Sequence, residues 1–86
     1  RDGIPQDIPT TNQVITVSGL LNRNEMLLLL GNYQRGRTER TSVTLPFRSV
    51  TGLKDLRGEK SPPATRTFTV DVPAQSIRLF YIKGTL

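Results

Sequence analysis

The sequence predicts an all-β fold: a small antiparallel β-sandwich of about six strands with Greek-key-like connections. The clearest observation is the run 65–72, in which three apolar residues alternate with polar ones, because period-2 alternation places successive side chains on opposite faces of a strand. Pro73 then separates this run from a second β-rich run over 76–82, which predicts a terminal hairpin. Turn signals recur about every ten residues, as in small sandwiches, and no segment has convincing helical periodicity.

The first part of the chain predicts an extended lead-in followed by the domain itself. Residues 1–11 contain two prolines and isolated isoleucines, so we expect an extended lead-in or a linker from a preceding domain. A single sandwich domain then covers 12–86. Its first strand is expected at 13–17, where β-branched residues precede a turn at 18–19.

The stretch 20–30 allows two interpretations. It could form a short helix closed by Gly31, or a strand that is buried on both faces. Asn22 and Asn24 favour a turn, and the apolar run 26–30 has no stripe of period 3.6. Because the neighbouring segments are all β, we expect a strand.

The remaining strands follow from alternation and turn residues. We expect them at 42–47, 50–56, 66–72 and 76–82. Pro46 has no amide hydrogen to donate, so it indicates an edge position or the end of its strand.

The apolar faces of these strands predict the core. The inward residues are expected to be Ile15, Val17, Leu28, Val43, Leu45, Phe68, Val70, Leu79 and Tyr81.

The last strand is apolar on its other side as well. Phe80 and Ile82 share that side with Arg78, and a small sandwich has only one interior. We therefore expect Phe80 and Ile82 to contact a neighbouring domain.

The composition argues against catalysis by this chain alone. Its 86 residues include no Cys, no His and no Trp, which removes the usual general base, thiolate nucleophile and commonest metal ligand. The seven acidic residues are scattered without paired spacing. We expect no catalytic residue, no cofactor and no metal site. No apolar run reaches the length of a membrane span, so no membrane partner is expected, and a start at Arg1 suggests a piece of a longer protein.

Three features could carry binding. Arg35, Arg37 and Arg40 form the densest basic loop and could contact phosphates, although a solvated loop explains them better. Tyr33 and Tyr81 could stack on a glycan. Asp55 and Glu59 could be an acid pair, but turn and surface carboxylates are the better interpretation. The candidate ligand or interface contacts are therefore Tyr33, Arg35, Arg37, Phe80 and Ile82.

The order of the motifs resembles a known family. The relevant segments are 26–33 (MLLLLGNY), 42–47 (SVTLPF), 53–59 (LKDLRGE), 68–74 (FTVDVPA) and 76–82 (SIRLFYI). They resemble the C-terminal β-sandwich of (β/α)-barrel glycoside hydrolases of the α-amylase and α-galactosidase kinds. The likeness covers about residues 13–83. Two departures are the missing Thr before Gly58 and the unusually basic loop 34–40.

This resemblance implies a non-catalytic accessory domain. It would stabilise or dock on the preceding catalytic domain of the same polypeptide, and the parent would be a secreted or periplasmic glycosidase. Two alternatives stay open, a carbohydrate-binding module and, ranked last, a basic nucleic-acid-binding β-barrel.

Overall fold

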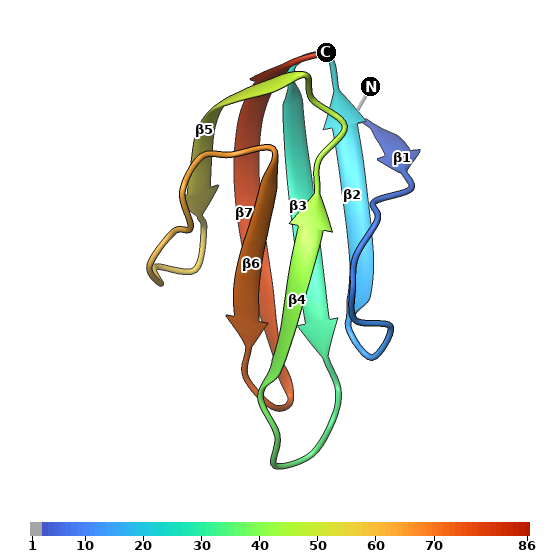
Figure 1. Cartoon of the computed structure of the whole chain (residues 1–86), viewed down its shortest axis with the longest axis vertical. Helices are drawn as coiled ribbons and strands as arrows, with labels where there is room; N and C mark the ends of the chain where they lie inside the picture. Colours follow the sequence, from blue (N-terminus) through green and yellow to red (C-terminus); the bar gives the residue numbers. More distant parts are fainter. Residues whose placement is uncertain (1–2) are drawn as a thin grey trace.

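The computed structural model describes residues 3–86, which form seven strands in two antiparallel sheets and no helix. The expected all-β sandwich is confirmed (Figure 1). One sheet has five strands in the order β1-β2-β3-β7-β5, and the other pairs β4 with β6. The strands are β1 Ile4–Gln6, β2 Thr16–Asn22, β3 Glu25–Asn32, β4 Glu39–Thr44, β5 Ser49–Asp55, β6 Thr67–Val72 and β7 Ser76–Thr85.

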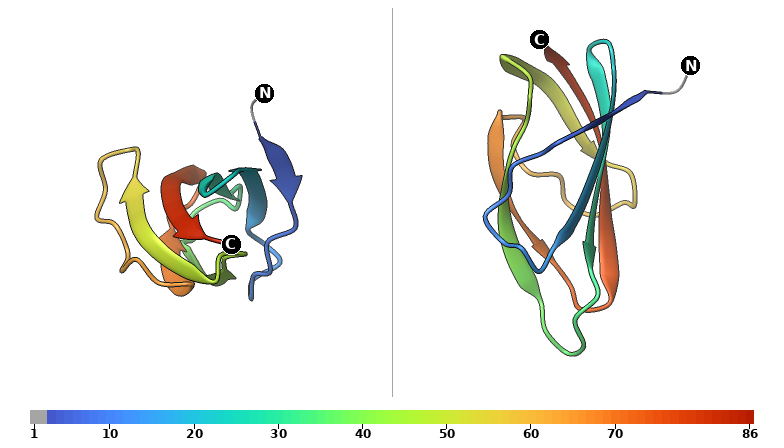
Figure 2. Two further views of the ribbon diagram at one scale, coloured as in Figure 1. Left: turned by 90° about the horizontal axis from the view of Figure 1, so that it is seen from above. Right: turned by 90° about the vertical axis from the view of Figure 1, so that its right-hand side faces the viewer.

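The two sheets enclose one hydrophobic core. From β3 onward, each strand is connected along the chain to a strand of the other sheet. Figure 2 shows the resulting two layers in its right-hand view. The rings of Phe68 on β6 and Phe80 on β7 meet edge to face across the core, with centroids 5.8 Å apart. Six of the nine predicted core residues are buried, and Val17 packs against the core in a partly buried position.

The stretch 20–30 is β-strand and not helix, as expected, but it is not one strand and it is not buried on both faces. It contains the end of β2, a two-residue turn and most of β3, with Asn22 paired to Glu25. Arg23 has a φ of 59° in this turn, the left-handed region that hairpin turns require. The asparagines around it are therefore the turn signal.

The first expected strand is also displaced. β2 begins at Thr16 and continues through 18–19, where a turn was expected. Gly19 faces inward at this point, and a Cβ there would lie 3.0 Å from Cγ1 of Ile8. The glycine therefore allows close packing inside a strand and does not end it.

The last strand has its two faces reversed relative to the sequence-based expectation. Phe80 and Ile82 are completely buried, whereas Leu79 and Tyr81 lie on the outer face. The register explains this, because Leu28 of β3 pairs with Phe80 and directly opposed residues point to the same side of a sheet. Phe80 and Ile82 are thus core residues and do not form an exposed interface.

The chain before β2 packs against both sheets. β1 pairs with β2, while Thr11 donates its amide hydrogen to the Ser42 carbonyl of β4 at 3.1 Å. Ile8 lies between these points and is 7% exposed. Figure 2 shows this blue segment passing from one layer to the other. Residues 3–11 therefore cover one open side of the sandwich.

The strand β4 keeps the inward face that was predicted from the sequence, but its bounds differ from the expected ones. β4 ends at Thr44, before Pro46, but Leu45 and Phe47 beyond it remain buried. The ring of Phe47 lies against β7, where a Cβ at Gly84 would be 2.5 Å from its Cγ. Only a glycine allows the ring this close to the strand.

Candidate interaction surface

The outer face of the five-stranded sheet is apolar across its middle. Leu20 of β2 is paired with Leu27 of β3, which is paired in turn with Tyr81 of β7. On an adjacent rung Leu29 is paired with Leu79. Because opposed residues of paired strands share a face, these side chains form one continuous surface. We call it the outer apolar face and define it by Leu20, Leu27, Leu29, Leu56, Ile77, Leu79 and Tyr81.

The described chain shields this face only in part: Leu29, Ile77, Leu79 and Tyr81 are half-buried, and the other three side chains are exposed. Leu20 and Leu27 are 41% and 44% exposed, and Leu56 is 44% exposed beside Leu79, whose carbonyl accepts the Leu56 amide hydrogen at 2.8 Å. Single exposed leucines are common on soluble proteins, but a contiguous apolar group on one sheet face is the usual signature of an interaction site.

One end of the outer apolar face is hollowed. A depression of about 360 Å³ lies there, with Leu20, Leu27 and Tyr81 supplying apolar side chains. The Tyr81 hydroxyl donates a hydrogen bond of 2.7 Å to Glu25, and this bond to a carboxylate, followed by burial, raises the pKa of Tyr81. The hydrogen bond holds Glu25 at the edge of the depression.

A polar lip adjoins the depression at the β2–β3 turn. It surrounds a second hollow of about 580 Å³, lined by Asn22, Arg23, Asn24, Glu25 and Lys83. The Gly84 amide donates to the Asn24 carbonyl at 2.9 Å, so the turn is held against β7. The lip has two cationic side chains and one carboxylate.

Tyr33 lies at the opposite end of the same face. It is 67% exposed, and its Cε2 and Oη lie 3.1 Å from the position that a Cβ would take at Gly31. The ring therefore rests on the glycine, which leaves room for it. Sequence analysis selected both tyrosines without knowing that they share a face.

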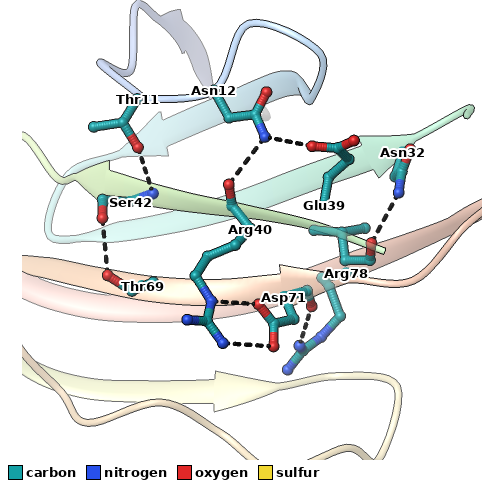
Figure 3. Close-up of polar contacts among 10 residues, drawn as sticks. Thr11, Asn12, Asn32, Glu39, Arg40, Ser42, Thr69, Asp71 and Arg78 are labelled. Carbon is teal, nitrogen blue, oxygen red and sulfur yellow. Dashed lines mark hydrogen bonds and ion pairs between the residues drawn. The ribbon is translucent and has the colours of Figure 1, made fainter. Parts of the chain in front are cut away.

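The basic loop is largely paired within the chain. Arg37 forms an ion pair with Glu39 at 2.9 Å, and Arg40 binds Asp71 through two hydrogen bonds of 2.7 and 3.3 Å (Figure 3). The bond from Arg40 is also the main reason that the pKa of Asp71 lies below its usual value. Of the three arginines only Arg35 has no partner among residues 3–86, so the structure does not assemble an arginine cluster here.

Asp55 is a structural residue and not half of an acid pair. Arg78, 7% exposed, donates to Asp55 Oδ2 from Nε at 3.0 Å and from Nη2 at 2.9 Å. Burial alone would raise the pKa of Asp55, but hydrogen bonds from the Arg57 amide, the Arg78 guanidinium and the Glu59 amide lower it below its usual value. Glu59 contributes its backbone and not its carboxylate to this cluster.

Arg78 also fixes the surrounding backbone. Its Nη1 donates to the Asp71 carbonyl at 2.9 Å, and its Nη2 donates to the Lys60 carbonyl at 3.1 Å. The cluster joins β5, β6 and β7 to the loop between β5 and β6. The sequence-based expectation placed Arg78 on the outer side of the last strand together with Phe80 and Ile82, and nothing in the sequence showed that Asp55 is its partner.

Sequence reasoning also missed two asparagines. Asn32 is fully buried and donates to the carbonyls of Arg37 and Val72 at 2.8 and 2.9 Å. Asn12 donates to Glu39 Oε1 and to the Arg40 carbonyl at 2.9 and 3.0 Å. Both side chains tie loops to strands, and a polar residue at the end of an apolar run was the available signal for Asn32.

Residues 3–86 provide neither a metal site nor a transmembrane helix. They contain no group of three or more acidic side chains that could hold a metal ion, and no helix long and apolar enough to cross a membrane.

Comparison with protein-family models, curated protein sequences and solved structures gives no match. The resemblance to glycoside hydrolase C-terminal domains therefore depends on the sequence motifs alone.

Proposed function

We propose that this chain is a non-catalytic β-sandwich domain that packs through its outer apolar face against a neighbouring protein domain. The observation that carries the proposal is the apolar row Leu20, Leu27 and Tyr81 beside Leu29 and Leu79 on the outer side of the five-stranded sheet, where Leu20 and Leu27 are exposed. A patch of this kind favours burial in an interface. The sequence resemblance names the expected partner, the catalytic barrel of a glycoside hydrolase in the same polypeptide.

The state of the carboxylates supports a non-catalytic role. Glu25, Glu39, Asp55 and Asp71 each bind a side chain of the same domain. General acid–base catalysis needs a carboxyl group within reach of a substrate and with a pKa matched to its task. The pKa values of Asp55 and Asp71 are lowered, the wrong direction for a general acid at neutral pH.

The test compares the outer apolar face with an exposed apolar residue elsewhere. Leu27→Ser combined with Leu79→Ser should lower the melting temperature of a polypeptide in which this chain is joined to its neighbouring domain. It should leave the 86-residue chain folded. Val14→Ser is the matched control, because Val14 is 42% exposed but lies outside this face. Equal melting temperatures for the double variant and the control in the longer polypeptide would contradict the proposal.

A glycan platform is the second candidate, since Tyr33 and Tyr81 lie on the same sheet face. Tyr33 follows Leu27, the strand partner of Tyr81, by six residues, which corresponds to about 20 Å along an extended chain. Leu29 and Leu79 form a rung between the two tyrosines, and they offer no hydrogen-bonding group to sugar hydroxyls. Protein docking is therefore favoured. Binding on a glycan array that is lost with Tyr33→Ala would favour the glycan instead.

A further inference from the structure

We propose that the partner contacts this domain with a large apolar side chain flanked by a carboxylate: the apolar group enters the depression of Leu20, Leu27 and Tyr81, and the carboxylate meets Arg23 and Lys83 at its lip. This inference rests on the proposed function and specifies the chemistry of the partner.

The size and lining of the depression support the inference that it binds a large apolar side chain. Its volume of about 360 Å³ admits one or two large side chains, and its leucines and tyrosine ring provide apolar contact. Interfaces derive most of their binding free energy from a few such anchors in pockets near a water-excluding surface. The depression adjoins Leu29 and Leu79, so an anchor there continues the outer apolar face.

The charges of the lip support the inference that a carboxylate of the partner binds there. Arg23 and Lys83 form no ion pair within residues 3–86, whereas Glu25 is already bound to the Tyr81 hydroxyl. Two cations thus stand against one engaged carboxylate, in a chain of net charge +5. A carboxylate of the partner would complement this charge, while a second copy of the chain would bring like charges together.

The backbone at Arg23 makes this residue suitable for a test of the inference. Its φ of 59° suits glycine or asparagine, and a long side chain in this region is uncommon and strained. Glycine can therefore replace Arg23 without backbone strain, so that Arg23→Gly removes the side chain and leaves the turn intact. Gln75, with a φ of 53° in the turn between β6 and β7, provides a matched position away from the lip.

The experiment uses the absence of tryptophan from the chain, which makes the fluorescence of a tryptophan-containing peptide a specific signal. Three probes share one apolar pair and differ in flanking charge: Asp-Asp-Leu-Trp-Asp-Asp, Asn-Asn-Leu-Trp-Asn-Asn and Lys-Lys-Leu-Trp-Lys-Lys, all blocked at both ends. We expect the acidic peptide to bind at least about 10-fold more tightly than the neutral one at low salt. This preference should decrease as salt screens the charges.

Four variants locate the binding. Arg23→Gly and Lys83→Gln should each reduce the acidic preference several-fold, and Arg23→Gly should not lower stability because it relieves the turn. Gln75→Gly is the control for a glycine substitution at a positive φ, and Lys60→Gln is the control for the loss of one positive charge. Both variants should bind the peptides as the unmodified chain does.

The outcomes separate this inference from the proposed function. Equal binding of the acidic and neutral peptides, no binding of any peptide, or an equal loss with Lys60→Gln would overturn the acidic-anchor inference. The proposed function depends instead on the melting temperatures of the longer polypeptide.

Discussion

Arg78 shows how one buried charge can determine the orientation of a strand. Its guanidinium lies 5.1 Å from the centroid of the Phe80 ring and binds Asp55 at the end of the core. Every buried side-chain polar atom of the described residues has a hydrogen-bond partner. A buried arginine is tolerated only under this condition.

Removing one partner of this pair should be strongly destabilising. Asp55→Ala leaves Arg78 buried without a counter-ion, and we expect a loss of about 3–5 kcal/mol in the free energy of unfolding, measured by urea denaturation. The double variant Asp55→Leu with Arg78→Met should lose less than Asp55→Ala alone. Asp71→Ala, which breaks the exposed pair with Arg40, should lose less than about 1 kcal/mol. Similar losses for Asp55→Ala and Asp71→Ala would contradict this assignment.

The lowered pKa of Asp55 predicts a pH dependence of stability. Because the folded-state pKa lies below the unfolded value, this stabilisation is complete above the unfolded pKa of about 4 and is lost as the pH falls through the folded pKa. The urea midpoint should therefore decrease below about pH 4. Asp55→Asn should flatten this decrease, whereas Asp7→Asn at an exposed position should retain it. A decrease of the same size in Asp55→Asn would show that other groups cause it.

Among the strands, β7 has apolar residues on both faces, one facing the core and the other facing outward. Met26 and Leu28 of β3 pair with Ile82 and Phe80, so the even-numbered side chains of β7 enter the core. The expectation of an exposed neighbouring-domain contact at Phe80 is thereby replaced by one at Leu79 and Tyr81. The strand still has two apolar faces, and the outer one is only half-buried.

Serine substitutions on the two faces of β7 should have different effects. Phe80→Ser removes a fully buried ring and should lower the free energy of unfolding by about 3–5 kcal/mol, enough to unfold much of the population. Leu79→Ser, on the outer face, should lower it by about 1 kcal/mol or less. Circular dichroism and urea denaturation measure both. A folded, stable Phe80→Ser variant would restore the orientation predicted from the sequence.

At the scale of the whole molecule, the segment before β2 closes the sandwich. It pairs with β2 in one sheet, and the Thr44 amide of β4 donates to its Pro9 carbonyl at 3.1 Å in the other. Ile8 fills the space between the sheets. The segment thereby protects the edge of β4, which would otherwise be open to pairing with another chain.

Two isoleucines of this segment provide a matched test. Ile8→Ala should lower the free energy of unfolding by about 2–4 kcal/mol, because the side chain is buried in the core. Ile4→Ala should change it by no more than about 0.5 kcal/mol, since Ile4 is 57% exposed. Thermal and urea denaturation of the two variants make the comparison. Equal effects would mean that the segment does not pack as described.

Sequence patterns alone were enough to predict the fold class and most of the core. Alternation in 42–47 and 66–72 identified Val43, Leu45, Phe68 and Val70 as inward, because a strand with one polar face can be oriented in only one way. It also predicted that the last strand is apolar on both faces, which agrees with its pairing to β3.

Contacts between distant parts of the chain determine the features for which the sequence pattern allows two equally good arrangements. In β7 both faces are apolar, so only the pairing with β3 and the burial of Arg78 against Asp55 set which side enters the core. The outer apolar face and its lip combine residues from separate strands, and the hairpin turn that brings Arg23 beside Lys83 follows from the register of β2, β3 and β7. Local sequence carries no information about such contacts, because the energies that fix them come from partners distant in the chain.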